Sequence, residues 1–280
     1  MNDGEPPPHE LTGLRAALAA RDPFLATFLL LPRVEMVELA ARAGFSAVIV
    51  DLEHGPITVA VLPELAAAAR AEGIHAIARL AGNTPEEIGK TLDTGVSGVM
   101  VPHVGSRQQA EEVVAAGRFP PAGDRSINPY TRGNGYDLGG AVTVSEVNAR
   151  VGLIAMLEGA DVVANFADIC RVPDLDAIFI GPVDLAASLG LEGDSEHPDV
   201  IAAVRDALGR AVRAGRPAGA YAPTPAAGVR WSAAGASLVA VSADVAMILG
   251  AFRSAAATFE ELRRRSVPAV GAAPVPRSET

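Results

Sequence analysis

Short apolar runs alternate with amphipathic segments along most of the chain. An apolar run of roughly four to eight residues bounded by Gly, Pro or polar residues predicts a buried strand, and apolar positions that recur every three to four residues predict a helix. The predicted strands are Phe24–Leu31, Ala47–Asp51, Ala76–Leu80, Gly98–Pro102, Gly152–Glu158, Ala177–Gly181, Ala218–Tyr221 and Leu238–Ser242. The predicted helices are Arg33–Ala43, Val59–Glu72, Pro85–Asp93, Gln108–Gly117, Val162–Cys170, Val200–Ala214, Pro225–Ala234 and Val245–Arg265. Because eight strands alternate with helices, we predict an α/β fold whose parallel sheet closes into a (β/α)8 TIM barrel.

The two ends of the chain differ from the part between them. Residues 1–12 and 266–280 are rich in Pro, Gly and Ala without periodicity, so we expect a flexible N-terminus and a disordered tail. Residues 13–265 are expected to form a single barrel domain that ends in a long helix. One long segment, 119–136, interrupts the alternation of strands and helices, and loops of that length are typically lids or insertions.

Composition and charge restrict the class of partner. The chain has 280 residues, of which 49% are hydrophobic, and its 23 basic and 33 acidic residues give a net charge of −10. An acidic protein lacks the cationic surface that nucleic acids and anionic membranes require. No apolar run approaches the roughly 18 residues of a membrane span, and the N-terminus does not resemble a signal peptide. We therefore expect a cytoplasmic protein that acts on a small molecule.

Cysteine and lysine each occur only once. Cys170 lies within a helical pattern, so it is expected to be a buried, small apolar residue, and no intrachain disulfide can form. Lys90 lies in a capped helix that is expected to be largely exposed. Schiff-base catalysis needs a desolvated lysine at the mouth of the barrel. The sequence therefore argues against that mechanism.

Two predicted strands end in a single carboxylate. Glu158 follows the apolar run Leu153–Leu157, and Asp184 follows Asp176–Val183. The C-terminal ends of the strands in a parallel barrel meet at one mouth, so these two acids are expected to lie side by side. Two carboxylates suit a hard divalent ion that keeps other positions for water or substrate oxygens. We predict that Glu158 and Asp184 hold such an ion.

Other ionisable residues lie at neighbouring strand ends. Asp51, Glu53 and His54 follow the second strand, and His54 is a candidate general base whose tautomer a carboxylate would fix. The alternative is a structural histidine held by backbone contacts in the turn. Arg79 ends the third strand, where a buried guanidinium requires an anion. His103, after the fourth strand, is a weaker candidate for the same mouth.

These motifs resemble the HpcH/HpaI family of metal-dependent pyruvate aldolases, which includes 4-hydroxy-2-oxoheptanedioate and 2-keto-3-deoxy sugar acid aldolases. The resemblance covers roughly residues 22 to 255. The segments that carry it are Val48-Ile-Val-Asp-Leu-Glu-His54, the strand of Arg79, Arg118-Phe-Pro-Pro-Ala-Gly-Asp-Arg125, Leu157-Glu158 and Phe179-Ile-Gly-Pro-Val-Asp-Leu185.

The resemblance implies a TIM barrel that assembles into a hexamer, a trimer of dimers, with the C-terminal helix exchanged between subunits. It also implies Mg, Mn or Co at Glu158 and Asp184, and a 2-oxo acid substrate that chelates the ion. His54 would be the base with Asp51 as its dyad partner, and Arg79 would stabilise the enolate. Asp93 would reach the dyad of a neighbouring subunit. The substrate-binding turn that it implies consists of Gly181, Pro182, Val183 and Asp184.

The activity implied by the resemblance is that of a carbon–carbon lyase. It cleaves or forms a 4-hydroxy-2-oxo acid, giving pyruvate and an aldehyde through a pyruvate enolate that the metal stabilises. The alternatives are a related metal-enolate enzyme, either a CoA-ester lyase or a biosynthetic enzyme that decarboxylates oxaloacetate, and a non-catalytic barrel. The chain departs from the family pattern at two expected substrate-binding residues, Met156 and Tyr221, and also at His103 and Ser126. These departures are expected to reshape the aldehyde side of the pocket.

Overall fold

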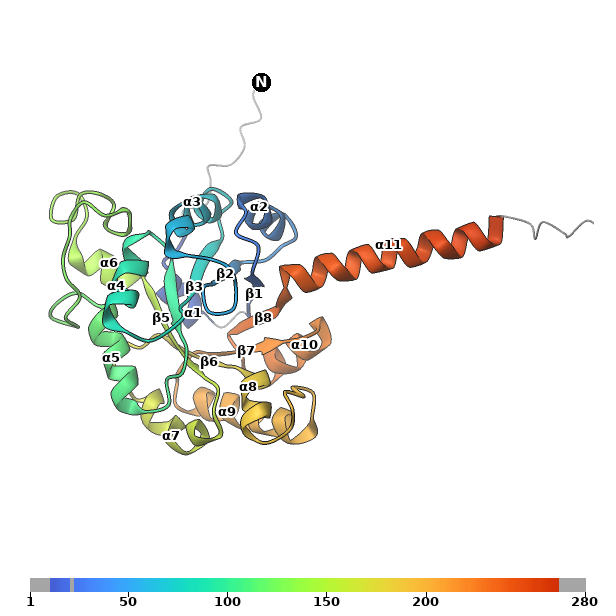
Figure 1. The fold of residues 1–280 in the computed structure, drawn as a ribbon. Helices are drawn as coiled ribbons and strands as arrows, with labels where there is room; N and C mark the ends of the chain where they lie inside the picture. Colours follow the sequence, from blue (N-terminus) through green and yellow to red (C-terminus); the bar gives the residue numbers. More distant parts are fainter. Residues whose placement is uncertain (1–10, 21–22, 267–280) are drawn as a thin grey trace, which may run out of the picture. The chain divides into compact units, whose positions relative to one another are not determined.

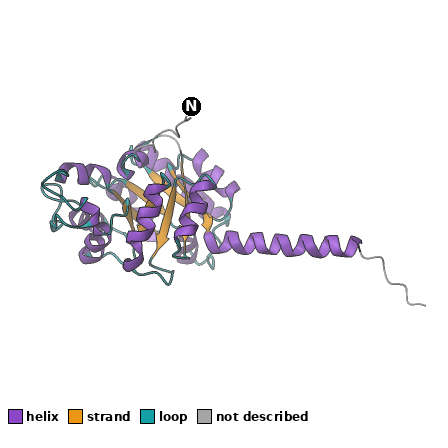
Figure 2. Cartoon of the chain, turned by 90° about the horizontal axis from the view of Figure 1, so that it is seen from above, coloured by secondary structure: helices purple, strands orange, loops and turns teal. Residues whose placement is uncertain are grey.

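Eight parallel strands close into a barrel in the computed structural model, which describes residues 11–20 and 23–266 (Figures 1 and 2). Each strand pairs with the next along the chain, and β8 pairs with β1. The predicted TIM barrel is therefore confirmed. The expectations for residues 1–10 and 267–280 lie outside the described residues. The strands are β1 (Phe24–Leu29), β2 (Ala47–Asp51), β3 (His75–Arg79), β4 (Gly98–Val101), β5 (Gly152–Leu157), β6 (Ala177–Ile180), β7 (Ala218–Ala222) and β8 (Leu238–Ala243).

Helices lie outside the strands, as Figure 2 shows. Those matching predicted helices are α2 (Val34–Arg42), α3 (Leu62–Ala71), α4 (Pro85–Asp93), α5 (Arg107–Gly117), α7 (Ala160–Cys170), α9 (Pro198–Arg213), α10 (Pro225–Ala233) and α11 (Asp244–Ser266). There are two short 3-10 turns among the described residues. The first, η1 (Val59–Val61), directly precedes α3, and the second, η2 (Arg132–Asn134), lies in the long loop after α5. Each predicted helix therefore exists, with ends shifted by a few residues. Among the described residues, every helix is too short or too polar to cross a bilayer.

Three short helices were not predicted: α1 (Leu14–Ala19), α6 (Val144–Arg150) and α8 (Pro182–Ser188). Each has six or seven residues, too few for a clear apolar period. A signal for α6 was present in the sequence, because Thr143 and Glu146 form a capping box at its N-terminus.

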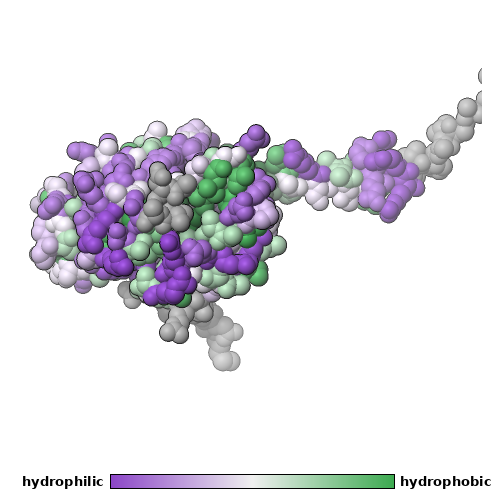
Figure 3. Space-filling view, turned by 90° about the horizontal axis from the view of Figure 1, so that it is seen from below, coloured by the Kyte–Doolittle hydropathy of each residue, from purple (hydrophilic) through white to green (hydrophobic). Residues whose placement is uncertain are grey.

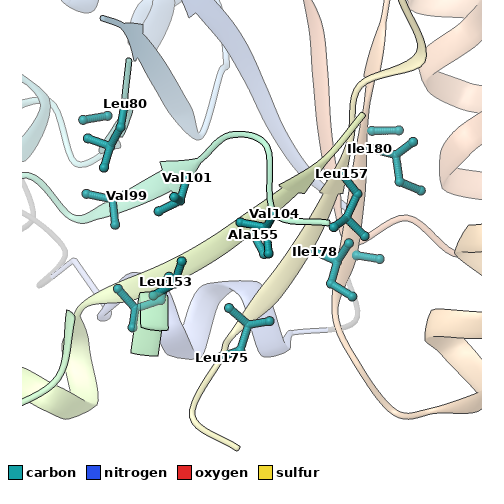
Figure 4. Close-up of a cluster of buried hydrophobic side chains, with 14 of the residues drawn as sticks. Leu80, Val99, Val101, Val104, Leu153, Ala155, Leu157, Leu175, Ile178 and Ile180 are labelled. Carbon is teal, nitrogen blue, oxygen red and sulfur yellow. The ribbon is translucent and has the colours of Figure 1, made fainter. Parts of the chain in front are cut away.

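The strands separate two apolar layers. Alternate side chains point into the barrel, as Ile154 and Met156 do, or outward toward the helices, as Leu153 and Leu157 do (Figure 4). Cys170 is buried in the outer layer, as predicted. This alternation leaves the strand ends as the places where polar side chains meet inside the barrel.

Helix α1 covers the N-terminal end of the barrel. Its Leu14 and Leu18 are buried within the inner apolar cluster. Leu14 packs so closely on the first residues of β4 and β5 that a Cβ on Gly98 or Gly152 would lie 2.7 or 2.6 Å from its Cδ2. Because this end is filled by apolar side chains, the C-terminal end is the one available for ligands.

The chain divides after Asp244 into two units, and most of α11 belongs to the second. This helix has 23 residues and ends in three arginines, which suit the negative end of a helix dipole. Its large apolar side chains, among them Phe252, Phe259 and Leu262, are exposed, and Figure 3 shows apolar and hydrophilic residues side by side along it. The predicted C-terminal helix is present, and its exchange between subunits stays a prediction.

Candidate active site

The last residues of β2 and β3 form a buried ion pair. Asp51 and Arg79 are register partners on adjacent strands, and both are buried. Arg79 donates from Nε to Asp51 Oδ1 at 3.0 Å and from Nη2 to Oδ2 at 2.5 Å. A bidentate, charge-assisted pair fixes the guanidinium plane. Arg79 therefore reaches the mouth of the barrel in one defined orientation.

Glu53 adds a second carboxylate to Arg79. Its Oε2 lies 3.3 Å from Arg79 Nη1, and its Oε1 lies 3.1 Å from His103 Nε2. The Glu53 side chain is only 11% exposed. The sequence placed Glu53 at the strand end but gave no reason to assign it a role, because its neighbours are distant along the chain. Two acids now face one arginine, so the net charge here is negative.

His54 lies at the surface of the same mouth. Its imidazole is 62% exposed and its Nε2 is 3.9 Å from Glu53 Oε2. The carboxylate of Asp51 accepts a hydrogen bond from the backbone amide of His54 at 3.2 Å, whereas its side-chain partner is Arg79. Within this chain, Asp51 therefore contacts the main chain of His54. The predicted dyad between Asp51 and the His54 imidazole stays a prediction.

Glu158, directly after β5, is a buried carboxylate with one oxygen that forms no hydrogen bond. This oxygen, Oε2, is inaccessible, and its close charged neighbour is His103, whose Nδ1 lies 2.9 Å away. Burial raises the pKa of Glu158; His103 opposes this rise, and Glu53 and Asp184 add to it. His103 has a φ of +56°, which a β-carbon disfavours. The His103 imidazole lies between the carboxylates of Glu53 and Glu158 at the mouth of the barrel, the location expected from its place after the fourth strand.

A divalent ion fits this charge distribution. A buried oxygen without a donor, beside other carboxylates, is stabilised by a cation. Among the described residues, no group of three or more His, Cys, Asp or Glu side chains is arranged to hold a metal. Two carboxylates, Glu158 and Asp184, would thus leave most coordination positions to water or substrate, as is typical for Mg²⁺.

The turn between β6 and α8 supplies backbone donors. Strand β6 ends at Ile180, and Pro182 begins α8, so the amides of Val183 and Asp184 lie in the first helical turn, where the helix offers no acceptor. Gly181 is needed for close packing, because a Cβ there would lie 3.0 Å from Met156 Cε and 3.1 Å from Glu158 Cγ. The turn is therefore held against the acidic strand end.

Many of these residues line a cavity of about 290 Å³, but Glu53, His103 and Glu158 are not part of its lining. It contains nearly all the predicted catalytic and substrate-binding residues, together with apolar residues that were not predicted. Its lining consists of Phe28, Leu30, Asp51, His54, Arg79, Met156, Gly181, Pro182, Val183, Asp184, Tyr221 and Ala243. The sequence offered no signal for Phe28, Leu30 and Ala243, because apolar residues near strand ends look like core residues.

Asp93 lies elsewhere in the chain. It ends α4, and its Oδ1 accepts a hydrogen bond from Arg125 Nη2 at 2.6 Å. Both line a second cavity, of about 540 Å³, on the outside of the barrel. Lys90 lines the same outer cavity and is exposed, as predicted. A role for Asp93 at an active site requires a second subunit and stays a prediction.

Comparisons with known proteins agree with this geometry. The chain is 36% identical over 231 residues to a pyruvate aldolase of Rhizobium etli, covering 82% of this chain and 90% of that protein. It is 34% identical to a 2-dehydro-3,6-dideoxy-6-sulfogluconate aldolase of Pseudomonas putida, covering 80% and 88%. An HpcH/HpaI aldolase/citrate lyase family structure from Burkholderia cenocepacia superposes with a TM-score of 0.82 at 31% identity, covering 89% and 98%. Residues 25–249 match the model of the HpcH/HpaI aldolase/citrate lyase family. The chain therefore belongs to this family of carbon–carbon lyases, as the sequence motifs predicted.

Proposed function

We propose that the chain cleaves or forms a 4-hydroxy-2-oxo acid, giving pyruvate and an aldehyde. The observation that carries the proposal is the buried Oε2 of Glu158, which forms no hydrogen bond and, among the described residues, has only His103 as a close charged partner. Glu158 packs against Gly181, which lines the cavity together with Arg79, His54 and Asp184. A cation site, a fixed guanidinium and an accessible imidazole suit metal-dependent retro-aldol cleavage, in which the first two stabilise the enolate and the third moves the proton.

Glu158 and Asp184 would hold a divalent ion, Mg, Mn or Co, which when bound supplies a Lewis acid to the 2-oxo group. The backbone amides of Val183 and Asp184 donate to the substrate carboxylate. Their position at the start of α8 orients the rest of the substrate toward Arg79. Met156 and Gly181 form the apolar floor against which the short oxo-acid portion lies.

The proton and electron movements are assigned to His54 and Arg79. His54 takes the proton of the 4-hydroxyl group as the C3–C4 bond breaks, and the bonding electrons move onto the C2 oxygen. Arg79, held by Asp51 and Glu53, donates to that oxygen as it becomes negative. The aldehyde leaves, and the proton held by His54 is returned to C3, which gives pyruvate and restores the neutral imidazole. Because Arg79 is already oriented, little reorganisation accompanies the change in charge.

We also propose the hexamer that the family resemblance implies. The exposed Phe252, Phe259 and Leu262 on α11 support it, since a helix with uncovered aromatic and aliphatic residues favours association. In such an assembly, Asp93 would be available to a neighbouring site. The mass of the protein in solution by light scattering would test this, and a monomer would contradict it. A cytoplasmic location stays a prediction.

A second candidate is carbon–carbon bond formation that starts from oxaloacetate. A solved structure described as citrate synthase SbnG superposes with a TM-score of 0.80 at 28% identity, covering 90% of this chain and 99% of that one. The same cavity groups would serve, because decarboxylation of oxaloacetate also places negative charge on the C2 oxygen.

The test is pyruvate release from a series of 4-hydroxy-2-oxo acids, with oxaloacetate decarboxylation measured in parallel. Each substrate is assayed after EDTA treatment and again after addition of Mg, Mn or Co. We expect activity that EDTA abolishes and a metal restores. Decarboxylation without any aldol cleavage would favour the second candidate. Absence of pyruvate under every condition would contradict both.

A further inference from the structure

One wall of the cavity is aromatic. Phe28, near the end of β1, is buried, and the guanidinium carbon of Arg79 lies 4.8 Å from its ring centroid. Tyr221 on β7 meets the Phe28 ring edge-on, with centroids 5.9 Å apart and planes at 65°. Leu30 and Met156 continue this surface. The wall of Phe28, Leu30, Met156 and Tyr221 thus lies beside the catalytic groups.

Tyr221 presents a hydrogen-bond donor at this wall. Trp231 Nε1 donates to the Tyr221 carbonyl oxygen at 3.0 Å, which fixes the strand that carries the ring. The residue is half-buried, and no described group forms a hydrogen bond with its hydroxyl. Burial raises the pKa of Tyr221, so the hydroxyl stays protonated near neutral pH. A ligand in the cavity therefore meets an apolar ring with one O–H group.

The cavity has no spare cation for a second anionic group. Of the described residues that line it, Arg79 is the only Lys or Arg, and it is paired with both Asp51 and Glu53. Asp184 also lines the cavity, and its charge adds to the rise in the pKa of Glu158. The 2-oxo acid portion already uses Arg79 and the divalent ion. The other ionisable lining residues are Asp51, Asp184, Tyr221 and His54, and His54 is assigned to the proton transfer. A carboxylate on the aldehyde portion would therefore find no free cation in this lining, which is costly in a partly buried site.

We propose that the aldehyde partner is uncharged, with an apolar substituent on the Phe28–Tyr221 wall and an oxygen that accepts a hydrogen bond from the Tyr221 hydroxyl. This inference rests on the proposed aldolase function and adds the substrate class. Tyr221 is then a specificity-determining residue, because its hydroxyl selects an aldehyde with an oxygen that accepts a hydrogen bond.

The experiment separates enolate formation from aldehyde recognition. Exchange of the pyruvate methyl protons in D2O, followed by NMR with the metal-loaded protein, reports the enolate without any aldehyde. Aldol addition of pyruvate is then compared for butanal and 4-oxobutanoate, which have the same number of carbons and differ in one terminal carboxylate. We expect kcat/KM to be about tenfold or more higher for butanal, because one unpaired charge in such a site costs at least about that factor.

The hydroxyl is tested with methoxyacetaldehyde, which places an ether oxygen where butanal has a methylene. We expect Tyr221→Phe to lower the preference for methoxyacetaldehyde over butanal by about three- to tenfold, the usual effect of one hydrogen bond. Tyr221→Arg should shift the preference toward 4-oxobutanoate. Tyr130→Phe is the matched control, since Tyr130 is exposed and lies outside the cavity lining, and it should leave both ratios unchanged.

The outcomes are distinguishable. Proton exchange together with a preference for 4-oxobutanoate would overturn this inference and leave the aldolase proposal intact. A methoxyacetaldehyde-to-butanal ratio unchanged by Tyr221→Phe, together with a 4-oxobutanoate-to-butanal ratio unchanged by Tyr221→Arg, would overturn the role of Tyr221. Absence of both proton exchange and aldol addition with every metal would overturn the proposed function, and this inference with it.

Discussion

The two ends of the barrel both bury charged groups, but they treat them differently. At the N-terminal end, Arg118 is fully buried and pairs with Asp176, and its terminal nitrogens also donate to backbone carbonyls of Asn148, Val151 and Asp174. At the C-terminal end, the only ionisable side chain of the described residues that pairs with Glu158 is the exposed His103, and Glu158 Oε2 forms no hydrogen bond. Arg118 Nε and Glu158 Oε2 are both buried atoms without a hydrogen bond, but of the two residues only Arg118 has several other partners. Removing a partner from a buried pair is strongly destabilising, whereas a buried acid with so few partners favours a cation beside it.

The largest expected effect comes from removing the negative charge of Glu158. Glu158→Gln should reduce metal-dependent turnover by at least about 10³-fold, because the cation loses an ionised ligand. Its thermal stability without metal should be equal to or above that of the wild type, since burial disfavours the ionised side chain. Glu111→Gln, at an exposed position on α5, is the control. Turnover within tenfold of the wild type would contradict the assignment.

Within the C-terminal end, His54 should affect turnover without affecting metal binding. His54→Ala should lower turnover by roughly 10²–10⁴, the usual effect of losing a general base. Because its imidazole is 62% exposed and is not an expected ligand, metal affinity measured by calorimetry should hardly change. A large fall in metal affinity would show that His54 acts on the ion instead.

Removing a charge at the N-terminal end should affect folding instead of turnover. Asp176→Ala leaves the guanidinium of Arg118 buried without its carboxylate, so the free energy of unfolding should fall by about 3–5 kcal/mol. Asp174→Asn is the matched control, because Asp174 pairs with the partly exposed Arg15 and Asn tolerates its φ of +58°, so the loss should be less than about 1 kcal/mol. Urea unfolding measures both. Equal losses in the two variants would contradict the contrast between the ends.

The sequence was sufficient for the barrel and for part of the site. Each of the eight strands was predicted, since apolar runs and turn residues are local signals. The acids at the ends of β5 and β6 followed from the shared mouth of a parallel barrel. The pairing of side chains could not be predicted, because the contact between Asp51 and Arg79 depends on the register of two adjacent strands. The aromatic wall was missed, as Phe28 has the same sequence pattern as a core residue.

A smaller effect concerns pH and the N-terminal end of β3. His75 is buried beside Phe24, and burial lowers its pKa from 6.5 to about 4. The unfolded chain therefore binds a proton below about pH 6.5 that the folded chain does not, so stability falls as the pH falls. Between about pH 7 and pH 5 this contribution is about 2 kcal/mol. His75→Leu should reduce the pH dependence of urea unfolding by that amount, and an unchanged dependence would contradict it.

The smallest expected effect is at Lys90, and it separates two aldolase chemistries. The chain has a single lysine, which is exposed on α4 and lines the outer cavity with Asp93 instead of the mouth of the barrel. A Schiff-base lysine has to face the substrate at the mouth of the barrel. Lys90→Ala should therefore change turnover by less than about twofold, and borohydride with pyruvate should not inactivate the wild type. Inactivation by borohydride, together with loss of activity in Lys90→Ala, would show that the enzyme uses a Schiff base on Lys90 and not a metal ion held by the acids at the mouth.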